Sequence, residues 1–167
     1  MDSRRLYNDI QLLKRRIVDL EMGEVRLEID FVSGQGQFQG ELLVCGTGSH
    51  EEVSGSHIVF LDDTENWRRA CAGNKNSGSA ELVGIAVSDQ PHTNGVLVKG
   101  LFNISSSYVS GSSGHFATGS QVFISPHTSG SLTTTLPSGS GEIVRVIGHA
   151  INATTLYVSP SPDNIEV

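Results

Sequence analysis

The densest cluster of acidic side chains in this chain comprises Asp62, Asp63 and Glu65. Such carboxylates could bind Ca²⁺, or they could supply the two acids of a glycoside hydrolase. The spacing of an EF-hand loop is absent, and neighbours in sequence do not identify the two carboxylates that would flank a sugar. The simpler interpretation is a solvent-exposed turn, and we predict that this cluster performs no catalysis.

Other residue patterns that would indicate an enzyme are also missing. The six histidines occur singly, without the H-x-H or H-E-x-x-H spacing of metal sites. Cys45 and Cys71 form neither a C-x-x-C motif nor a Cys/His pair with zinc spacing, and no G-x-S-x-G segment presents a nucleophilic serine. The glycine-rich segment 34–40 differs from a dinucleotide-binding loop because its last glycine comes one residue late and no helical pattern follows. We therefore predict a non-enzymatic protein with no cofactor and no metal site.

Composition narrows the class of partner. The chain has 167 residues with 11 Lys and Arg against 18 Asp and Glu, which gives a net charge of −7 at pH 7. A nucleic-acid binder needs basic side chains gathered on one face to neutralise phosphates, so this balance argues against nucleic acid as a partner. The sequence has no run of about 18 apolar residues and does not open on a secretory signal, so we expect no membrane insertion and no secretion.

The N-terminal segment shows the repeat of a coiled coil. Apolar residues recur at alternating intervals of four and three, which places them at the a and d positions of a heptad. These residues are Leu6, Ile10, Leu13, Ile17 and Leu20. Charged residues at the flanking g and e positions would pair across a parallel seam, Asp9 with Lys14 and Arg16 with Glu21. We predict that this helix serves oligomerisation and anchoring.

The same pattern leaves alternatives open. About three heptads make a helix that is marginal alone in water, so packing must stabilise it, either against other copies or against its own domain. We favour the self-associating or docking helix, with Arg4 and Arg5 as candidate contacts to a partner. An amphipathic helix lying on its own domain is the alternative. So few heptads do not decide between a dimer and a trimer.

After Gly23 the hydrophobic period falls to two, which predicts strands. The predicted strands cover residues 25–31, 38–44, 56–61, 82–87, 95–102, 121–125, 142–149 and 155–158. Trp67 is expected at the edge of the core. The predicted fold class is mainly β, a short N-terminal coiled-coil-like helix followed by an antiparallel β-sandwich or a small β-barrel. We divide the chain into the helix and first strand at 1–33, a β-rich linker or first β-subdomain at 34–81, and a C-terminal β-domain at 82–167.

Five glycine-punctuated segments of the C-terminal half occur in a distinctive order. They are residues 84–87, 95–100, 118–125, 132–135 and 138–149. Together they resemble a β-domain found near the C-termini of cyanobacterial-phage virion structural proteins, and the resemblance covers about residues 82–158. The strongest piece is Gly-Ser-Gly-Glu-Ile-Val-Arg-Val-Ile-Gly at 139–148. The resemblance implies a virion surface or fibre component, usually homotrimeric, that is anchored through its N-terminus and displays its β-domain outward.

The size of this chain selects among such components. The single predicted helix is only about 30 Å long and no shaft repeats follow it, so a long tail fibre is not expected. We predict a homotrimeric head-decoration or cement protein that contacts phage capsid or tail proteins in the virion, and that is made in the cytoplasm of the bacterial host. The alternative is a short fibre or a tail or neck appendage that binds a host surface glycan, with Tyr108, His115 and Phe116 near polar loops as candidate sugar contacts.

Overall fold

The structure is a computed structural model, and it describes residues 38–49, 53–110 and 114–167. All described residues belong to one compact unit of the chain, Phe31–Val167. The predicted helix and the predicted strand 25–31 lie outside the described residues. The same holds for every residue assigned above to the helix seam, its flanks and its partner contacts: Arg4, Arg5, Leu6, Asp9, Ile10, Leu13, Lys14, Arg16, Ile17, Leu20 and Glu21.

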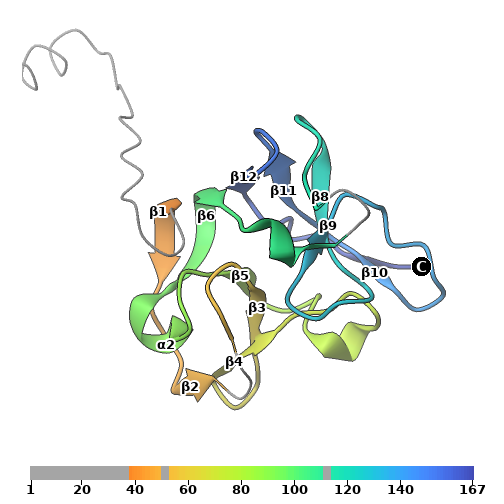
Figure 1. Ribbon diagram of the computed structural model, residues 1–167. Helices are drawn as coiled ribbons and strands as arrows, with labels where there is room; N and C mark the ends of the chain where they lie inside the picture. Colours follow the sequence, from red (N-terminus) through yellow and green to blue (C-terminus); the bar gives the residue numbers. More distant parts are fainter. Residues whose placement is uncertain (1–37, 50–52, 111–113) are drawn as a thin grey trace, which may run out of the picture. The chain divides into compact units, whose positions relative to one another are not determined.

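The described part of the chain is mainly β (Figure 1). Its strands are β1 (Phe38–Leu43), β2 (Gly48–Ser49), β3 (Ile58–Leu61), β4 (Asn66–Arg69), β5 (Val83–Ala86), β6 (Val96–Asn103), β7 (Val109–Ser110), β8 (Gln121–Ile124), β9 (Leu132–Thr133), β10 (Ile143–Val144), β11 (Val146–Ala150), β12 (Thr155–Val158) and β13 (Ile165–Glu166). The helical elements are single turns: η1 (Lys75–Ser77), α2 (Pro91–Asn94) and η2 (Ser106–Tyr108). The fold class predicted from the sequence is therefore confirmed at the level of a mainly β protein.

Eleven strands form one hydrogen-bonded sheet in the order β2-β4-β3-β5-β6-β12-β11-β8-β9-β7, with β1 added on β6, and β10 pairs with β13 separately. Two of the pairings, β2 with β4 and β7 with β9, are parallel, so the sheet is mixed rather than wholly antiparallel. Within the described residues the order has two free ends, β2 and β7, so the small β-barrel, one of the two predicted alternatives, is wrong. The strands at these two ends are only two residues long, whereas the outer edge of the six-residue β1 has no partner strand among the described residues.

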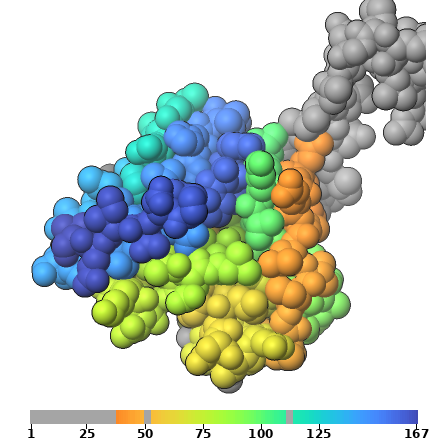
Figure 2. Space-filling model, turned by 180° about the vertical axis from the view of Figure 1, so that it is seen from behind, coloured from red at the N-terminus to blue at the C-terminus, as the bar shows by residue number. Residues whose placement is uncertain are grey.

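The sheet branches at β6. One edge of β6 pairs with β1, from Phe38 opposite Phe102 to Leu43 opposite Val96. The other edge is shared between β5 at its start and β12 at its end. Figure 2 shows the result from behind, with β1 in orange, β6 in green and the C-terminal strands in blue side by side.

A pair of facing glycines lets β1 and β6 approach closely at this branch. Gly40 lies opposite Gly100, and both have positive φ, +149° and +135°. A Cβ on Gly100 would lie 2.1 Å from the carbonyl oxygen of Gln39, so no other residue fits without moving the backbone. The two glycines therefore position the strand that holds both halves of the sheet.

Two clusters of buried apolar residues form the core. The larger one contains Ile58 and Phe60 from β3 together with Ile85, Leu97 and many residues of the C-terminal strands. The smaller one contains Val53, Val59, Trp67, Ala86 and Val96. Both clusters contain residues from each side of position 82, so the segments 38–81 and 82–167 share their cores. Trp67 is fully buried, and its indole nitrogen donates a hydrogen bond to the carbonyl oxygen of Cys45 at 2.8 Å.

Most predicted strands that fall on described residues are confirmed. The predictions at 38–44, 56–61, 82–87, 95–102, 121–125 and 155–158 correspond to β1, β3, β5, β6, β8 and β12. The predicted strand 142–149 is instead broken at Arg145 into β10 and β11, because the Arg145 side chain turns inward to bind backbone carbonyl groups. No helix in the described part of the chain has the length and apolar character needed to cross a membrane.

Candidate functional site

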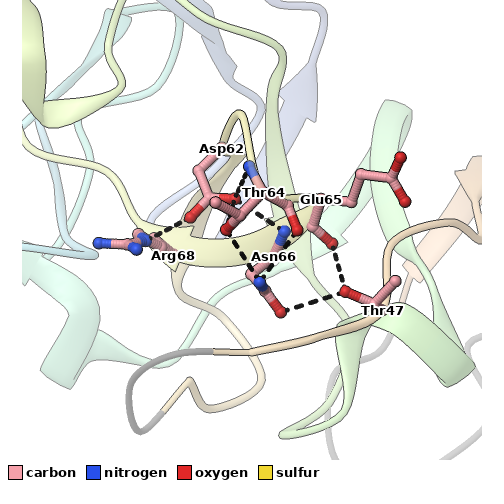
Figure 3. Close-up of polar contacts among 6 residues, drawn as sticks. All are labelled: Thr47, Asp62, Thr64, Glu65, Asn66 and Arg68. Carbon is pink, nitrogen blue, oxygen red and sulfur yellow. Dashed lines mark hydrogen bonds and ion pairs between the residues drawn. The ribbon is translucent and has the colours of Figure 1, made fainter.

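The acidic cluster singled out in the sequence forms the turn between β3 and β4, residues 62–65 (Figure 3). The Asp62 side chain lies at its centre. One carboxylate oxygen, Oδ1, accepts hydrogen bonds from the backbone N–H of Thr64 at 2.9 Å, from the Thr64 hydroxyl at 2.8 Å and from the backbone N–H of Asn66 at 2.8 Å. The other oxygen, Oδ2, forms an ion pair with Nε of Arg68 at 2.6 Å. Both oxygens are thus occupied by groups of the same hairpin.

This arrangement fixes the ionised form of Asp62. Partial burial works to raise the pKa of its carboxyl group, but the hydrogen bonds from Asn66, Thr64 and Arg68 outweigh burial and hold the pKa well below its usual range. A proton donor for catalysis needs the opposite shift, toward the working pH. The geometry therefore makes Asp62 a structural carboxylate that closes the hairpin, and the prediction of a turn at this cluster is confirmed.

Glu65 ends the turn in a strained conformation. Its φ is +60°, in the left-handed region where glycine is usual. Its carbonyl oxygen accepts hydrogen bonds from the backbone N–H of Thr47 at 2.8 Å and from the Thr47 hydroxyl at 3.3 Å. The turn is thereby attached to the segment that leads into β2, and the strain is supported by contacts from a distant part of the chain.

A hollow of about 500 Å³ opens beside the turn. It is lined by Phe60, Leu61, Asp62, Asp63, Arg68, Lys75, Asn76, Gly78 and Glu81. Asp62 and Arg68 are bound to each other, and the charge of Glu81 acts on Arg145, which is not part of the lining. Lys75, Asn76 and Asp63 remain exposed at the rim and can offer hydrogen bonds to solvent or to a polar surface. Within the lining, no nucleophile is paired with a base.

The candidate sugar contacts do not form an open platform. Phe116 is only 4% exposed and belongs to the larger core cluster. Tyr108 packs against that cluster, and its ring meets the ring of His57 edge to face with centroids 4.7 Å apart. His115 is exposed. Two of the three aromatic groups therefore serve the core, and the glycan-binding site expected from them is not supported.

Arg145 is a buried charged residue that sequence reasoning did not identify. It is 9% exposed, and its guanidinium donates to the carbonyl oxygens of Ser161 at 2.8 Å, Ser79 at 2.9 Å and Glu81. Burial lowers the pKa of Arg145, and the nearby charge of Glu81 acts to raise it. The signal in the sequence was a lone arginine between Ile-Val and Val-Ile, where alternation alone cannot tell an outward charge from an inward one.

Removing the carboxylate charge of Asp62 should change the acid sensitivity of the protein. In wild-type protein the pKa of Asp62 is lower folded than unfolded, so the unfolded state takes up this proton first as the pH falls toward 3 and stability decreases. Asp62→Asn removes this contribution, so its melting temperature should lie below that of wild type at pH 7 and approach it at pH 3. Thermal melts at both pH values measure the difference, and Asp63→Asn on the exposed neighbour is the matched control. An equal offset of Asp62→Asn at both pH values would contradict the role assigned to Asp62.

Among the residues the structure describes, no three His, Cys, Asp or Glu side chains are grouped as ligands for a metal ion. Cys45 and Cys71 are both half-buried free thiols, and the Cys71 sulfur donates to the carbonyl oxygen of Pro126 at 3.4 Å. Comparison with known proteins gives no match: no protein-family model, no curated sequence and no solved structure is significantly similar to this chain.

Proposed function

We propose that the chain is a non-enzymatic structural protein of a tailed-bacteriophage virion, a homotrimeric head-decoration or cement protein that binds capsid proteins. In this proposal it is made in the cytoplasm of the host bacterium and becomes part of the virion. The N-terminal coiled-coil-like helix supplies oligomerisation and anchoring, and the two halves of the branched sheet pack as a sandwich that is displayed outward. The proposal starts from the resemblance of residues 82–158 to virion β-domains.

The observation that carries the proposal concerns residues 139–148, the segment with the strongest resemblance to virion β-domains. Both of its charged side chains bind backbone groups. The Glu142 carboxylate accepts hydrogen bonds from the backbone N–H groups of Ser138 and Gly139, both at 2.9 Å. Arg145 binds carbonyl oxygens from two distant segments, at Ser79 and Ser161. Both charges of the motif thus hold backbone in place, which supports a motif that maintains a scaffold rather than one that binds a ligand.

The polar groups elsewhere support the same proposal. Asp62 belongs to the densest acidic cluster of the sequence, and both of its carboxylate oxygens are bound by groups of its own hairpin. A protein of this kind contributes by burying interface area, which stabilises an assembly by about 25 cal/mol per Å² of apolar surface before the costs of association. The receptor-binding alternative relied on aromatic side chains near polar loops as sugar contacts, and Phe116, one of them, is in the core.

A comparison of virions assembled with and without this chain tests the proposal. Virions that lack the chain should lose heat resistance, seen as release of their DNA at a lower temperature, because the contacts that clamp neighbouring capsid proteins are gone. Adding back the purified chain should restore the melting profile. The same preparation should release no sugar from the polysaccharide of the host.

The Asp63→Asn variant is the matched control for this experiment, since Asp63 is exposed at the rim of the hollow and should leave virion stability unchanged. Virions whose melting profile does not depend on the chain would contradict a cement role. Release of sugar by the wild-type protein and not by Asp63→Asn would replace the structural reading with an enzymatic one.

A further inference from the structure

One row of side chains crosses five neighbouring strands on the outer face of the sheet. Pairing places Gln39 of β1 opposite Leu101 of β6, Leu101 opposite Tyr157 of β12, Tyr157 opposite His149 of β11, and His149 opposite Gln121 of β8. With strands about 4.8 Å apart, the row is roughly 19 Å long. We call this row, Gln39, Leu101, Tyr157, His149 and Gln121, the cross-strand row.

The cross-strand row faces away from the core. Most of its neighbours along β6, β12, β11 and β8 are buried, namely Phe102, Leu156, Val158, Gly148, Ala150 and Val122. Because successive side chains of a strand point to opposite faces, the row itself points away from that core. Gln39 and Leu101 are half-buried at their end of the row, and the side-chain oxygen of Gln39 is buried. Tyr157 is 37% exposed, and His149 and Gln121 are exposed as well. Ile151, two residues after His149, adds an apolar side chain that is 50% exposed.

The segments that carry most of the row contain no charged residue. Residues 100–141 and 146–162 include no Asp, Glu, Lys or Arg. The nearest charges on this face are Lys99 and Glu41, which lie opposite each other, two residues from Leu101 and Gln39 of the row. Elsewhere in the described residues, charges gather around the β3–β4 turn and the hollow beside it. The part of this face formed by β8, β11 and β12, which contains the exposed Tyr157, therefore has no charged side chain of its own.

The charge of the chain limits which of its surfaces two copies can share. Each chain has a net charge of −7, so two copies repel at long range, and a contact between them is least opposed where the surfaces that meet add no further like charge. In a rotationally symmetric assembly, residues near the axis meet their own counterparts, so any charge there faces the same charge. An uncharged face avoids this repulsion and the desolvation of charges. Cores of protein interfaces are likewise depleted in Lys, Glu and Asp and enriched in Tyr.

We infer that the cross-strand row is a contact surface between copies of this chain and faces the symmetry axis of the oligomer. The inference deepens the proposed function, because it rests on the homotrimer in that proposal and assigns part of the subunit interface to the β unit. Tyr157 supplies the central contact area, and Gln121 and His149 supply hydrogen-bonding groups around it.

Two carboxylates placed on the row should weaken self-association. In the variant Gln121→Glu with Tyr157→Glu, the new charges lie two strands apart and meet their own copies at the axis. The concentration for half-assembly should rise at least about tenfold. Analytical ultracentrifugation of the full chain across a concentration series measures it. Part of the loss should be recovered in 1 M salt, where the screening length is about 3 Å. Circular dichroism verifies that the variant remains folded.

The matched control adds the same two charges elsewhere. Gln90→Glu with Thr93→Glu changes exposed residues at α2 and should leave assembly as in wild type. Tyr157→Phe keeps the ring without its hydroxyl and should assemble within about threefold of wild type. A monomeric wild-type chain, or equal assembly of the row and control variants, would overturn the inference.

Virion binding separates this inference from the proposed function. A row variant that assembles normally but no longer binds virions would show that the face contacts another virion protein, which overturns the inference and leaves the proposed function standing. A wild-type chain that assembles through the row but never binds virions would overturn the proposed function and leave the inference standing.

Discussion

Arg145→Met is expected to lower the free energy of unfolding by about 3 kcal/mol, since the buried guanidinium donates to three backbone carbonyl groups that methionine would leave without a donor. For a unit of this size that corresponds to a fall in melting temperature of roughly 6–12 °C. The bonds join the start of β11 to the segment at Ser79 and to the C-terminal segment at Ser161. Calorimetry or denaturant melts measure the loss.

Two controls separate the contribution of the hydrogen-bond fork from that of the charge. Arg145→Lys keeps a positive charge but cannot reach the carbonyl groups with several donors in one plane, so it should recover only part of the lost stability. Arg68→Met removes a half-exposed arginine with a single ion pair and should cost much less. If Arg145→Met melted within 2 °C of the wild type, the three bonds would not be what joins these segments.

Gly148→Ala is expected to have a similarly large effect, about 3 kcal/mol, through a steric clash. A Cβ at this position would lie 1.9 Å from the carbonyl oxygen of Tyr157, closer than real Cβ contacts allow. The atom in the way belongs to the backbone of β12, so no side chain can rotate aside, and the ladder between β11 and β12 must open locally. Urea melts of the variant and of wild type give the difference.

Gly119→Ala is the matched control for Gly148→Ala. Gly119 has a φ of +81°, and nothing lies within 4 Å of its Cβ position, so the substitution costs only the backbone strain, about 1 kcal/mol. A Gly148→Ala variant no less stable than Gly119→Ala would contradict the close approach of β11 and β12.

The strands that the sequence predicts are those with several apolar residues in a row or in alternation. β3, β5 and β12 have such patterns, because each strand has core contacts of its own. β4 was missed because Trp67 is its single apolar residue, between Asn66 and two arginines. This strand is held by its neighbours and by the Asp62 network rather than by a hydrophobic pattern.

The pairing of the strands could not be predicted, since it depends on contacts between distant residues. No pattern in the sequence of residues 105–119 indicates that the strand at Val109 pairs in parallel with the strand at Leu132 at the end of the sheet. The candidate site shows the same limit. The acidic turn was predicted from its composition, but the inward direction of Arg145 depends on the carbonyl groups of Ser79 and Ser161, which the fold brings to it.

The branch at β6 has a consequence for how the chain folds. β5 is a near neighbour of β6 in the sequence, but the rest of β6 pairs with strands that lie far away, β1 about 60 residues before it and β12 about 55 residues after it. Such non-local pairing slows folding, because the entropy of closing long loops must be overcome before the contacts form. Until Thr155–Val158 is available, the end of this edge of β6 from Gly100 to Asn103 remains open to strands of other molecules. Folding intermediates that lack β12 are therefore the species in which aggregation of this protein should begin.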